Sequence, residues 1–182
     1  GEILKHSLIK SKHFFNFLDK NYERILNLKS PYVEKAIYES CKIKRNVVEK
    51  DEKEKGLRKI LNFGHTFAHA YEASLGYSKK LNHGEAVILG IITALNFCFQ
   101  KQIIKKKEYD LISAHIKKAK LPSSLNKFFS SKNLNNIMSF MIKDKKNNSK
   151  KINLVLIKKI GSPIFNKEYN KKELNLFLKN FL

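Results

Sequence analysis

The residues between Gly56 and Gly76 carry a polar stripe on a segment that is otherwise apolar, and no other pattern in the chain constrains its fold as much. The polar side chains are spaced by 4, 3, 4 and 3 residues, which puts them on one face of a helix predicted over Leu57–Leu75. They are Arg58, Asn62, His65, His69 and Glu72. The usual amphipathic helix has an apolar stripe on a polar background, so this helix is inverted.

A polar stripe on a buried helix must face polar partners or a lined cavity, because an unpaired buried polar group costs about 1–3 kcal/mol. The stripe could instead be a seam that faces solvent, or its histidines could be satisfied within the core. Five aligned polar residues, among them one arginine and two histidines, favour a binding or catalytic site over both.

A third histidine, His83, precedes an apolar segment, 84–100, that is predicted as the next helix. A histidine at a helix N-terminus is held neutral, as a metal ligand must be. The two helices should be antiparallel neighbours, so we expect His83 near His65 or His69. Catalytic zinc sites often use two histidines and one carboxylate, but the spacing identifies no carboxylate and the segment is not an HExxH motif. The pattern alone predicts a metal or phosphate site and names no reaction.

Lys44 is unusual because it falls in the apolar stripe of a helix predicted over 30–48, in phase with Ile37, Cys41 and Val48. Its ammonium group could extend past apolar neighbours to solvent. Alternatively, it could point into the same polar cavity and bind an anion. The pattern does not choose between the two.

Most of the remaining chain also has helical periodicity. Further helices are predicted over 108–120, over 134–142 and from Asn170 or Lys171 to Leu182, and the very polar stretch 143–151 is predicted as a loop. A β-rich segment, 152–160, is followed by a turn and by Ile164-Phe165, which should pair back as a short hairpin. The predicted fold is therefore mainly α: one helical, bundle-like domain over 1–182 with a small β-hairpin near the C-terminus.

The amino-acid composition excludes some classes of protein. The chain has 182 residues and 42% hydrophobic content, which excludes a wholly disordered polycation. Its longest apolar run, 86–99, is shorter than the roughly 20 residues that cross a bilayer, so no membrane span is expected. The two cysteines, Cys41 and Cys98, are expected to be buried thiols in a reducing compartment, the cytoplasm.

The net charge of +21 would suit a nucleic-acid-binding helical module. However, only three of the 37 basic residues are arginines, which read bases and phosphates best, and the lysines are scattered along the chain. Nucleic-acid binding therefore stays a competing hypothesis, and the leading expectation is no nucleic-acid partner.

Several motifs together resemble the signature of the 3-dehydroquinate synthase family, over essentially the whole chain and in order. The matching strings are Glu2-Ile3-Leu4-Lys5, Asp51-Glu52-x-Glu54-x-Gly56-Leu57-Arg58, Leu61-Asn62-Phe63-Gly64-His65-Thr66-Phe67-Ala68-His69-Ala70, Gly76-Tyr77, His83-Gly84-Glu85-Ala86-Val87, Asp144-Lys145-Lys146 and the end of a late strand at Ile160-Gly161. The match is to the C-terminal, mainly helical half of that family. The N-terminal NAD-binding α/β domain is absent from this chain, which we expect to be part of a longer protein or a separately handled domain.

The resemblance implies roles for particular residues. It makes Glu2, His65 and His83 the zinc ligands, and it places Lys5 at a substrate hydroxyl. Further residues that it implies for substrate binding are Lys44 and Arg58 at the substrate carboxylate, Asn62 and His69 near the leaving phosphate, and either Lys145 or Lys146 at the phosphate.

The reaction implied by the resemblance converts 3-deoxy-D-arabino-heptulosonate 7-phosphate into 3-dehydroquinate and phosphate, with zinc (or cobalt) and NAD as cofactors. It belongs to the shikimate pathway of aromatic amino acid biosynthesis. The implied partners are a small phosphorylated substrate, the missing N-terminal domain and a second copy in a homodimer. Two variants remain: a related sugar-phosphate cyclase with another substrate, and a chain that keeps the fold but is inactive. Without its NAD-binding domain, the fragment alone is expected to be inactive.

Overall fold

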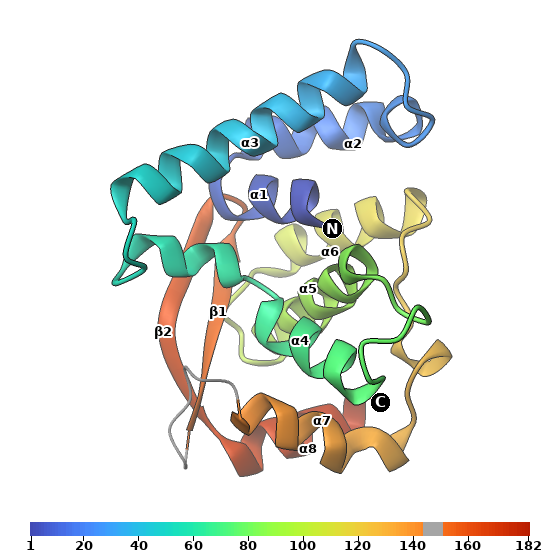
Figure 1. The fold of residues 1–182 in the computed structure, drawn as a ribbon, viewed down its shortest axis with the longest axis vertical. Helices are drawn as coiled ribbons and strands as arrows, with labels where there is room; N and C mark the ends of the chain where they lie inside the picture. Colours follow the sequence, from blue (N-terminus) through green and yellow to red (C-terminus); the bar gives the residue numbers. More distant parts are fainter. Residues whose placement is uncertain (144–150) are drawn as a thin grey trace.

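The computed structural model describes residues 1–143 and 151–182 as helices that surround one central helix, with a two-stranded sheet at one side (Figure 1). The helices, 3-10 helices (η) and strands are, in chain order, α1 (Glu2–Lys10), α2 (Lys12–Leu26), α3 (Tyr32–Lys50), η1 (Leu57–Asn62), α4 (His65–Ser74), α5 (His83–Gln100), α6 (Lys106–Lys118), η2 (Leu125–Lys127), η3 (Ser131–Asn133), α7 (Leu134–Lys143), β1 (Lys151–Lys159), β2 (Ser162–Asn170) and α8 (Lys171–Phe181). The mainly helical architecture with a hairpin near the C-terminus is confirmed.

The central helix, α5, forms the middle of the hydrophobic core. Most of its residues are buried, and α4, α6 and β1 pack against it. By length and composition alone α5 could cross a membrane, since its 18 residues have a mean hydropathy of 1.2, but 61% of the segment is buried inside the protein, as in the core helix of a globular domain. Its buried Thr93 shares a hydrogen bond of 2.8 Å with Tyr71 on α4, so the polar atom is satisfied. Cys98 is buried, as predicted, and burial raises its pKa to about 12.

The hairpin is longer than predicted. β1 pairs with β2 in antiparallel fashion from Lys151 opposite Asn170 to Lys159 opposite Ser162. Ile152, Leu154 and Leu156 are buried toward the core, so β1 shows the alternation of a half-buried strand. The second half of β2 is exposed and carries polar residues, which is why hydrophobicity indicated only its first residues. The last helix, α8, begins where predicted, with the Asn170 side chain accepting a hydrogen bond at its N-terminus.

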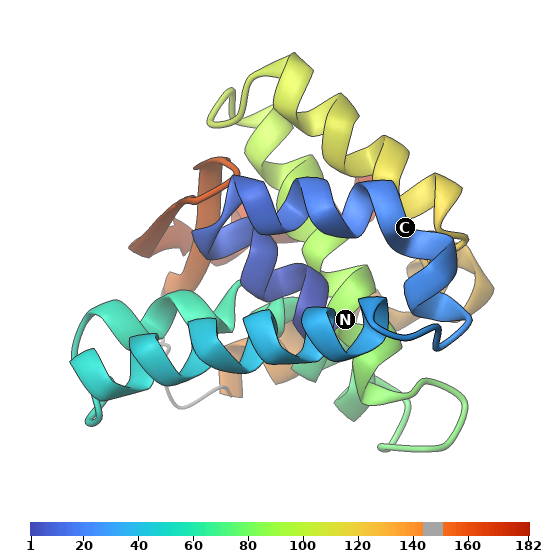
Figure 2. The same cartoon turned by 90° about the horizontal axis from the view of Figure 1, so that it is seen from above.

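Helices α1, α2 and α3 lie together across one end of the molecule (Figures 1 and 2). The Ser11 side chain caps α2 by accepting a hydrogen bond of 3.1 Å from the backbone of Phe14. A small second core, separate from the main one, joins α2 to α3; its buried members are Phe14, Leu18, Ala36 and Ile43.

The predicted apolar stripe of α3 was only partly right. It ran through Val33, Ile37, Ser40, Cys41, Lys44, Val47 and Val48, of which Ser40 and Val47 are buried. The buried residues are Ala36, Ser40, Ile43 and Val47. Ile37 is 50% exposed, and Cys41 is exposed rather than buried as predicted. The pattern missed Ala36 and Ile43, which pack in the second core with Phe14 and Leu18 of α2.

A buried histidine ties α2 to α6. The Nδ1 atom of His115 lies 2.9 Å from the Asp19 carboxylate, and Lys118 Nζ lies 2.8 Å from the same oxygen. The His115 ring also contacts Phe15, with 5.2 Å between centroids. Burial lowers the pKa of His115, and this outweighs the hydrogen bond to Asp19, which acts in the opposite direction.

The lowered pKa of His115 predicts a pH dependence of stability. Below its ordinary pKa of about 6.5, the unfolded chain binds a proton that the folded chain resists, so the free energy of unfolding falls as the pH falls, by at most about 1.4 kcal/mol per pH unit. In His115→Asn the amide can still donate to Asp19 but does not titrate. We expect its free energy of unfolding, measured with urea, to fall less between pH 7 and pH 5 than that of the wild type. Equal slopes for the two proteins would contradict this assignment.

Two glycines let α4 and α5 cross closely. A Cβ atom on Gly90 would lie 2.2 Å from the carbonyl oxygen of Gly64 and 3.0 Å from the backbone nitrogen of Ala68. Gly64 has a φ of +77°, and a Cβ there would lie 2.8 Å from the backbone nitrogen of Ile91. Neither position can hold a larger residue without separating the two helices, because the clashing atoms belong to the backbone.

Gly90→Ala is therefore expected to lower the free energy of unfolding by about 1–3 kcal/mol. Gly84→Ala is the matched control, because it lies on the same helix and a Cβ there would meet nothing closer than 3.8 Å. Thermal unfolding of both variants measures the difference. A Gly90→Ala variant as stable as Gly84→Ala would show that the close crossing is not required.

Candidate active site

The polar stripe is divided between two elements, so the prediction of one continuous helix over 57–75 was wrong. Arg58 and Asn62 lie on the 3-10 helix η1, whereas His65 and His69 lie on α4. Gly64 separates the two with its left-handed backbone, which no helix can continue through. Three of the polar side chains, Arg58, Asn62 and His65, still face one pocket, whereas His69 and Glu72 line a second one.

Asp51 fixes the loop that leads into η1. Its carboxylate accepts hydrogen bonds from the backbone of Arg58 at 2.9 Å, Gly56 at 2.8 Å and Lys55 at 2.9 Å. These bonds hold the pKa of Asp51 below its ordinary value. The Arg58 guanidinium donates to the carbonyl of Glu52 at 2.6 Å, so both the backbone and the side chain of Arg58 are anchored.

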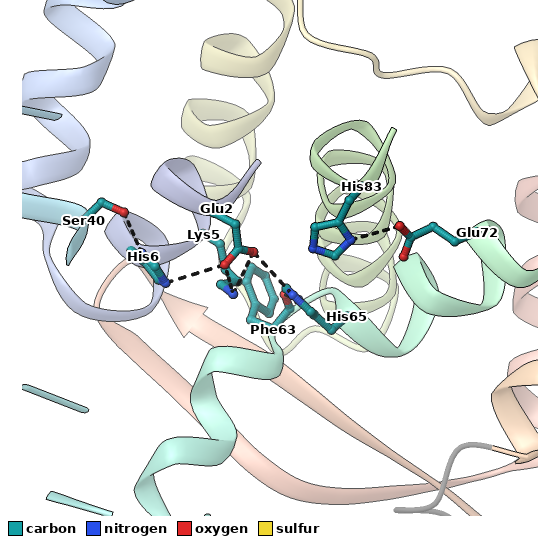
Figure 3. Close-up of polar contacts among 8 residues, drawn as sticks. All are labelled: Glu2, Lys5, His6, Ser40, Phe63, His65, Glu72 and His83. Carbon is teal, nitrogen blue, oxygen red and sulfur yellow. Dashed lines mark hydrogen bonds and ion pairs between the residues drawn. The ribbon is translucent and has the colours of Figure 1, made fainter. Parts of the chain in front are cut away.

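Three residues far apart in the sequence meet as a metal-binding arrangement. Glu2, His65 and His83 are each the first residue of a helix: α1, α4 and α5 (Figure 3). Their donor atoms all lie within 4.8 Å of one another. Two histidines and one carboxylate are a common ligand set of catalytic zinc sites. The predicted approach of His83 to His65 is confirmed, with 5.8 Å between their ring centroids.

The hydrogen bonds around both histidines orient them as ligands. Nδ1 of His83 lies 3.0 Å from the Glu72 carboxylate, and Nδ1 of His65 lies 3.3 Å from the carbonyl oxygen of Phe63 (Figure 3). An acceptor at Nδ1 places the proton there and leaves the lone pair on Nε2. Glu72 belonged to the predicted stripe, but its contact with His83 was missed because only tertiary packing brings them together.

The carboxylate of Glu2 is held ionised. Lys5 Nζ lies 2.9 Å from both of its oxygens, and His65 Nε2 lies 3.4 Å from Oε1. Burial opposes ionisation, but the contact with His65 and the charge of Lys5 outweigh it and hold the pKa of Glu2 well below its ordinary value. Oε1 is nevertheless buried without a hydrogen-bond partner of good geometry. A metal ion bound to this oxygen would satisfy it, so the residues fit a metal.

Next to these three residues lies a small pocket with cationic walls, which we call the cation-lined pocket. Its volume is about 190 Å³, and it is lined by Glu2, Lys5, His6, Lys44, Glu54, Arg58, Leu61, Asn62 and His65. Lys44 is exposed and borders this pocket from α3, so the pocket and the solvent are both within its reach. Burial lowers the pKa of Lys5, and the nearby charge of Lys44 acts in the same direction, whereas Glu2 opposes both.

Two larger recesses adjoin the predicted phosphate residues. One, of about 420 Å³, lies between η1 and the hairpin and is bordered by Asn62, whose amide donates to Glu54 at 2.7 Å. The other, of about 540 Å³, is bordered by His69 and Lys143. His69 also belongs to the histidine group, with its ring centroid 5.3 Å from that of His65. The predicted Lys145 and Lys146 lie outside the described residues.

Comparison with known proteins identifies the family of the chain. The family model "3-dehydroquinate synthase C-terminal" matches residues 1–147. The chain belongs to the 3-dehydroquinate synthase family. It is 63% identical over 182 residues to the 3-dehydroquinate synthase of Pelagibacter ubique and 40% identical over 162 residues to that of Aliivibrio fischeri. These matches take in 100% and 89% of the chain but 50% and 44% of the relatives, so it spans about half their length.

Solved structures show the same fold as this chain. A 2-epi-5-epi-valiolone synthase from Streptomyces hygroscopicus, with NAD+ and Zn2+ bound, matches with a TM-score of 0.80 and 18% identity over 99% of this chain and 49% of its own. A 2-deoxy-scyllo-inosose synthase complexed with carbaglucose-6-phosphate, NAD+ and Co2+ also matches with a TM-score of 0.80, at 20% identity over 100% of this chain and 51% of its own.

The contact between Glu72 and His83 predicts an indirect effect on metal binding. Glu72→Ala removes the acceptor that orients His83, and loss of such a partner typically weakens metal affinity about 10–100-fold. Competition between the chain and a chromophoric chelator for Zn2+ measures the change. Glu85→Ala is the control, because Glu85 caps the same helix end but hydrogen-bonds to the backbone of Asn82; an equal loss in both variants would contradict an effect specific to Glu72.

Proposed function

We propose that this chain is the metal- and substrate-binding half of a 3-dehydroquinate synthase that converts 3-deoxy-D-arabino-heptulosonate 7-phosphate into 3-dehydroquinate and phosphate. The observation that carries the proposal is the convergence of Glu2, His65 and His83 beside a pocket with cationic walls. The 63% identity to a relative of that name supports the substrate assignment. We expect a cytoplasmic enzyme and a homodimer.

The residues of the chain would divide the work of binding. Arg58 and Lys44 would hold the substrate carboxylate, for which the planar guanidinium of Arg58 offers paired hydrogen bonds. Lys5 would bind a ring hydroxyl beside the metal ligands. Asn62 and His69 would hold the phosphate, together with Lys145 or Lys146. The fixed positions of these cations would keep the substrate in one orientation through every step.

The metal and NAD would supply the remaining chemistry. Zinc or cobalt, held by Glu2, His65 and His83, would supply Lewis-acid polarisation of a substrate hydroxyl, and NAD would supply reversible hydride transfer at the carbon that bears this hydroxyl. The protein residues would hold the phosphate so that it leaves with the electron pair of its C–O bond, while a proton is lost from the neighbouring carbon. The NAD-binding half would come from the remainder of the enzyme, so we expect no turnover from these 182 residues alone.

A related sugar-phosphate cyclase is the second candidate. The two structural neighbours are named for other cyclisation products, so this fold serves more than one substrate. The cation-lined pocket distinguishes the candidates, because the paired cations Lys44 and Arg58 suit a substrate that carries a carboxylate. A substrate without a carboxylate would leave them without an anionic partner.

The decisive experiment joins this chain to the N-terminal half of the Pelagibacter ubique relative and assays the chimaera with the heptulosonate phosphate, NAD+ and Zn2+. We expect phosphate and 3-dehydroquinate to form in equal amounts. His65→Ala in the same chimaera should lose both bound zinc and turnover, because it removes a ligand. A chimaera that is folded and zinc-loaded but makes another product, or none, would refute the substrate assignment.

Arg58→Lys in the chimaera tests the carboxylate contact. Lysine keeps the charge but loses the paired hydrogen bonds, so we expect kcat/KM to fall about 10–100-fold, the equivalent of one charged hydrogen bond. Zinc content should not change, since Arg58 is not a ligand. Lys55→Arg, an exposed exchange of the same two residue types, is the control. An unchanged kcat/KM for Arg58→Lys would place the carboxylate elsewhere.

A further inference from the structure

His6 is a buried histidine whose role the proposed metal ligands do not explain. Its side chain is almost inaccessible to solvent, with 3% of the residue exposed. Nδ1 lies 2.7 Å from Ser40 Oγ, which comes from α3 and is itself buried. Nε2 is buried without a hydrogen-bond partner of good geometry, and the polar atom that faces it is Glu2 Oε2, at 3.9 Å (Figure 3). A polar nitrogen in this position requires a reason, because leaving it unpaired costs free energy.

The two oxygens of Glu2 face different neighbours. Oε1 is directed toward His65, whose Nε2 lies 3.4 Å away, and is therefore the oxygen on the side of the metal ligands. Oε2 accepts the hydrogen bond of 2.9 Å from Lys5 and lies on the side of His6. A carboxylate that binds a metal through one oxygen is oriented by donors at the other. Lys5 contacts both oxygens at 2.9 Å, so it supplies charge but does not distinguish between them.

The hydrogen bond to Ser40 determines which nitrogen of His6 carries the proton. If Ser40 donates to Nδ1, Nε2 carries the proton and presents a donor to Glu2. If Ser40 accepts from Nδ1, the lone pair of Nε2 faces the carboxylate and the two repel each other. The first arrangement satisfies every group, because a hydroxyl can donate and a carboxylate can only accept.

We propose that His6 is a positioning residue for the metal centre: Ser40 fixes its tautomer, and its Nε2–H holds Glu2 Oε2 so that Oε1 is presented to the metal. The inference rests on the metal site of the proposed function. It extends that site to a chain of three side chains in contact: Ser40 on α3, His6, and the carboxylate of Glu2. When a metal draws Glu2 into place, the carboxylate needs only a small rotation to shorten the 3.9 Å contact to a hydrogen bond.

The test measures Zn2+ affinity directly, by competition of the 182-residue chain with a chromophoric chelator at pH 7.5. His6→Phe keeps a ring of similar size but has no donor. His6→Gln restores a donor near the place of Nε2. Ser40→Ala keeps the imidazole but removes the group that fixes its tautomer. Thr93→Val is the matched control, because it breaks another buried hydrogen bond between helices, the 2.8 Å contact with Tyr71.

We expect His6→Phe to bind Zn2+ about 10–100-fold more weakly than the wild type. His6→Gln should recover most of the affinity, Ser40→Ala should lose part of it, and Thr93→Val should lose none. Circular dichroism and thermal unfolding in the presence of a chelator identify variants that fail to fold. If His6→Phe does not fold, Ser40→Ala, which removes a single oxygen, decides the question alone.

Several results would overturn the proposal. Wild-type affinity in folded His6→Phe or Ser40→Ala would exclude the positioning role, and equal losses in His6→Gln and His6→Phe would make the effect one of packing. If these variants bind like the wild type while His65→Ala does not bind, only the role of His6 falls and the metal site stands. If the wild-type chain binds no Zn2+, the metal site and this inference fall together, whatever the chimaera's substrate.

Discussion

The close crossing of α4 and α5 is the contact on which the site depends. Gly64 and Gly90 let the two backbones meet where any side chain would separate them. Gly64 directly precedes His65, so the glycine at the N-terminus of α4 also sets the position of a proposed metal ligand. His83 begins the other helix of the pair. The distance between two of the three ligands is thus fixed by backbone packing, which deforms little, rather than by flexible side chains.

The third ligand reaches the site from another layer. Glu2 lies on α1, which packs against α3, and α3 also supplies Lys44 and Ser40. The layer formed by α1, α2 and α3 therefore contributes the carboxylate of Glu2 and the cations Lys5 and Lys44, while α4 and α5 contribute the imidazoles of His65 and His83. Lys5 neutralises the half-buried carboxylate of Glu2 and so offsets the free energy that its burial costs.

The sequence predicted the elements better than their contacts. Hydrophobic periodicity found the core helix over 84–100 because the whole segment is apolar, and turn residues located the hairpin. It found only part of the buried face of α3, because it left out Ala36 and Ile43, which are buried against α2. The polar stripe did mark the site, although the left-handed backbone of Gly64 breaks the predicted helix in two. The spacing of the polar residues therefore located the site but did not reveal the break.

Hydrophobic periodicity alone could not predict the complete set of proposed metal ligands. His65 and His83 follow from neighbouring helices, but Glu2 needed the family resemblance, and the partners of the ligands came only from the structure. His6 and Ser40 lie on different helices, and so do Glu72 and His83. Contacts of this kind depend on how whole helices dock, and one sequence does not contain that information in local form.

Because each ligand is the first residue of its helix, a bound ion would join three chain segments, and Glu2 and His83 are separated by roughly 80 positions, a long loop to close. The metal would therefore act as a cross-link between the start of α1 and the two helices α4 and α5. Its loss would free the start of α1 while leaving the hydrophobic core in place. Metal binding would therefore affect how well ordered the start of α1 is, and with it the shape of the cation-lined pocket. It would affect the stability of the whole fold less.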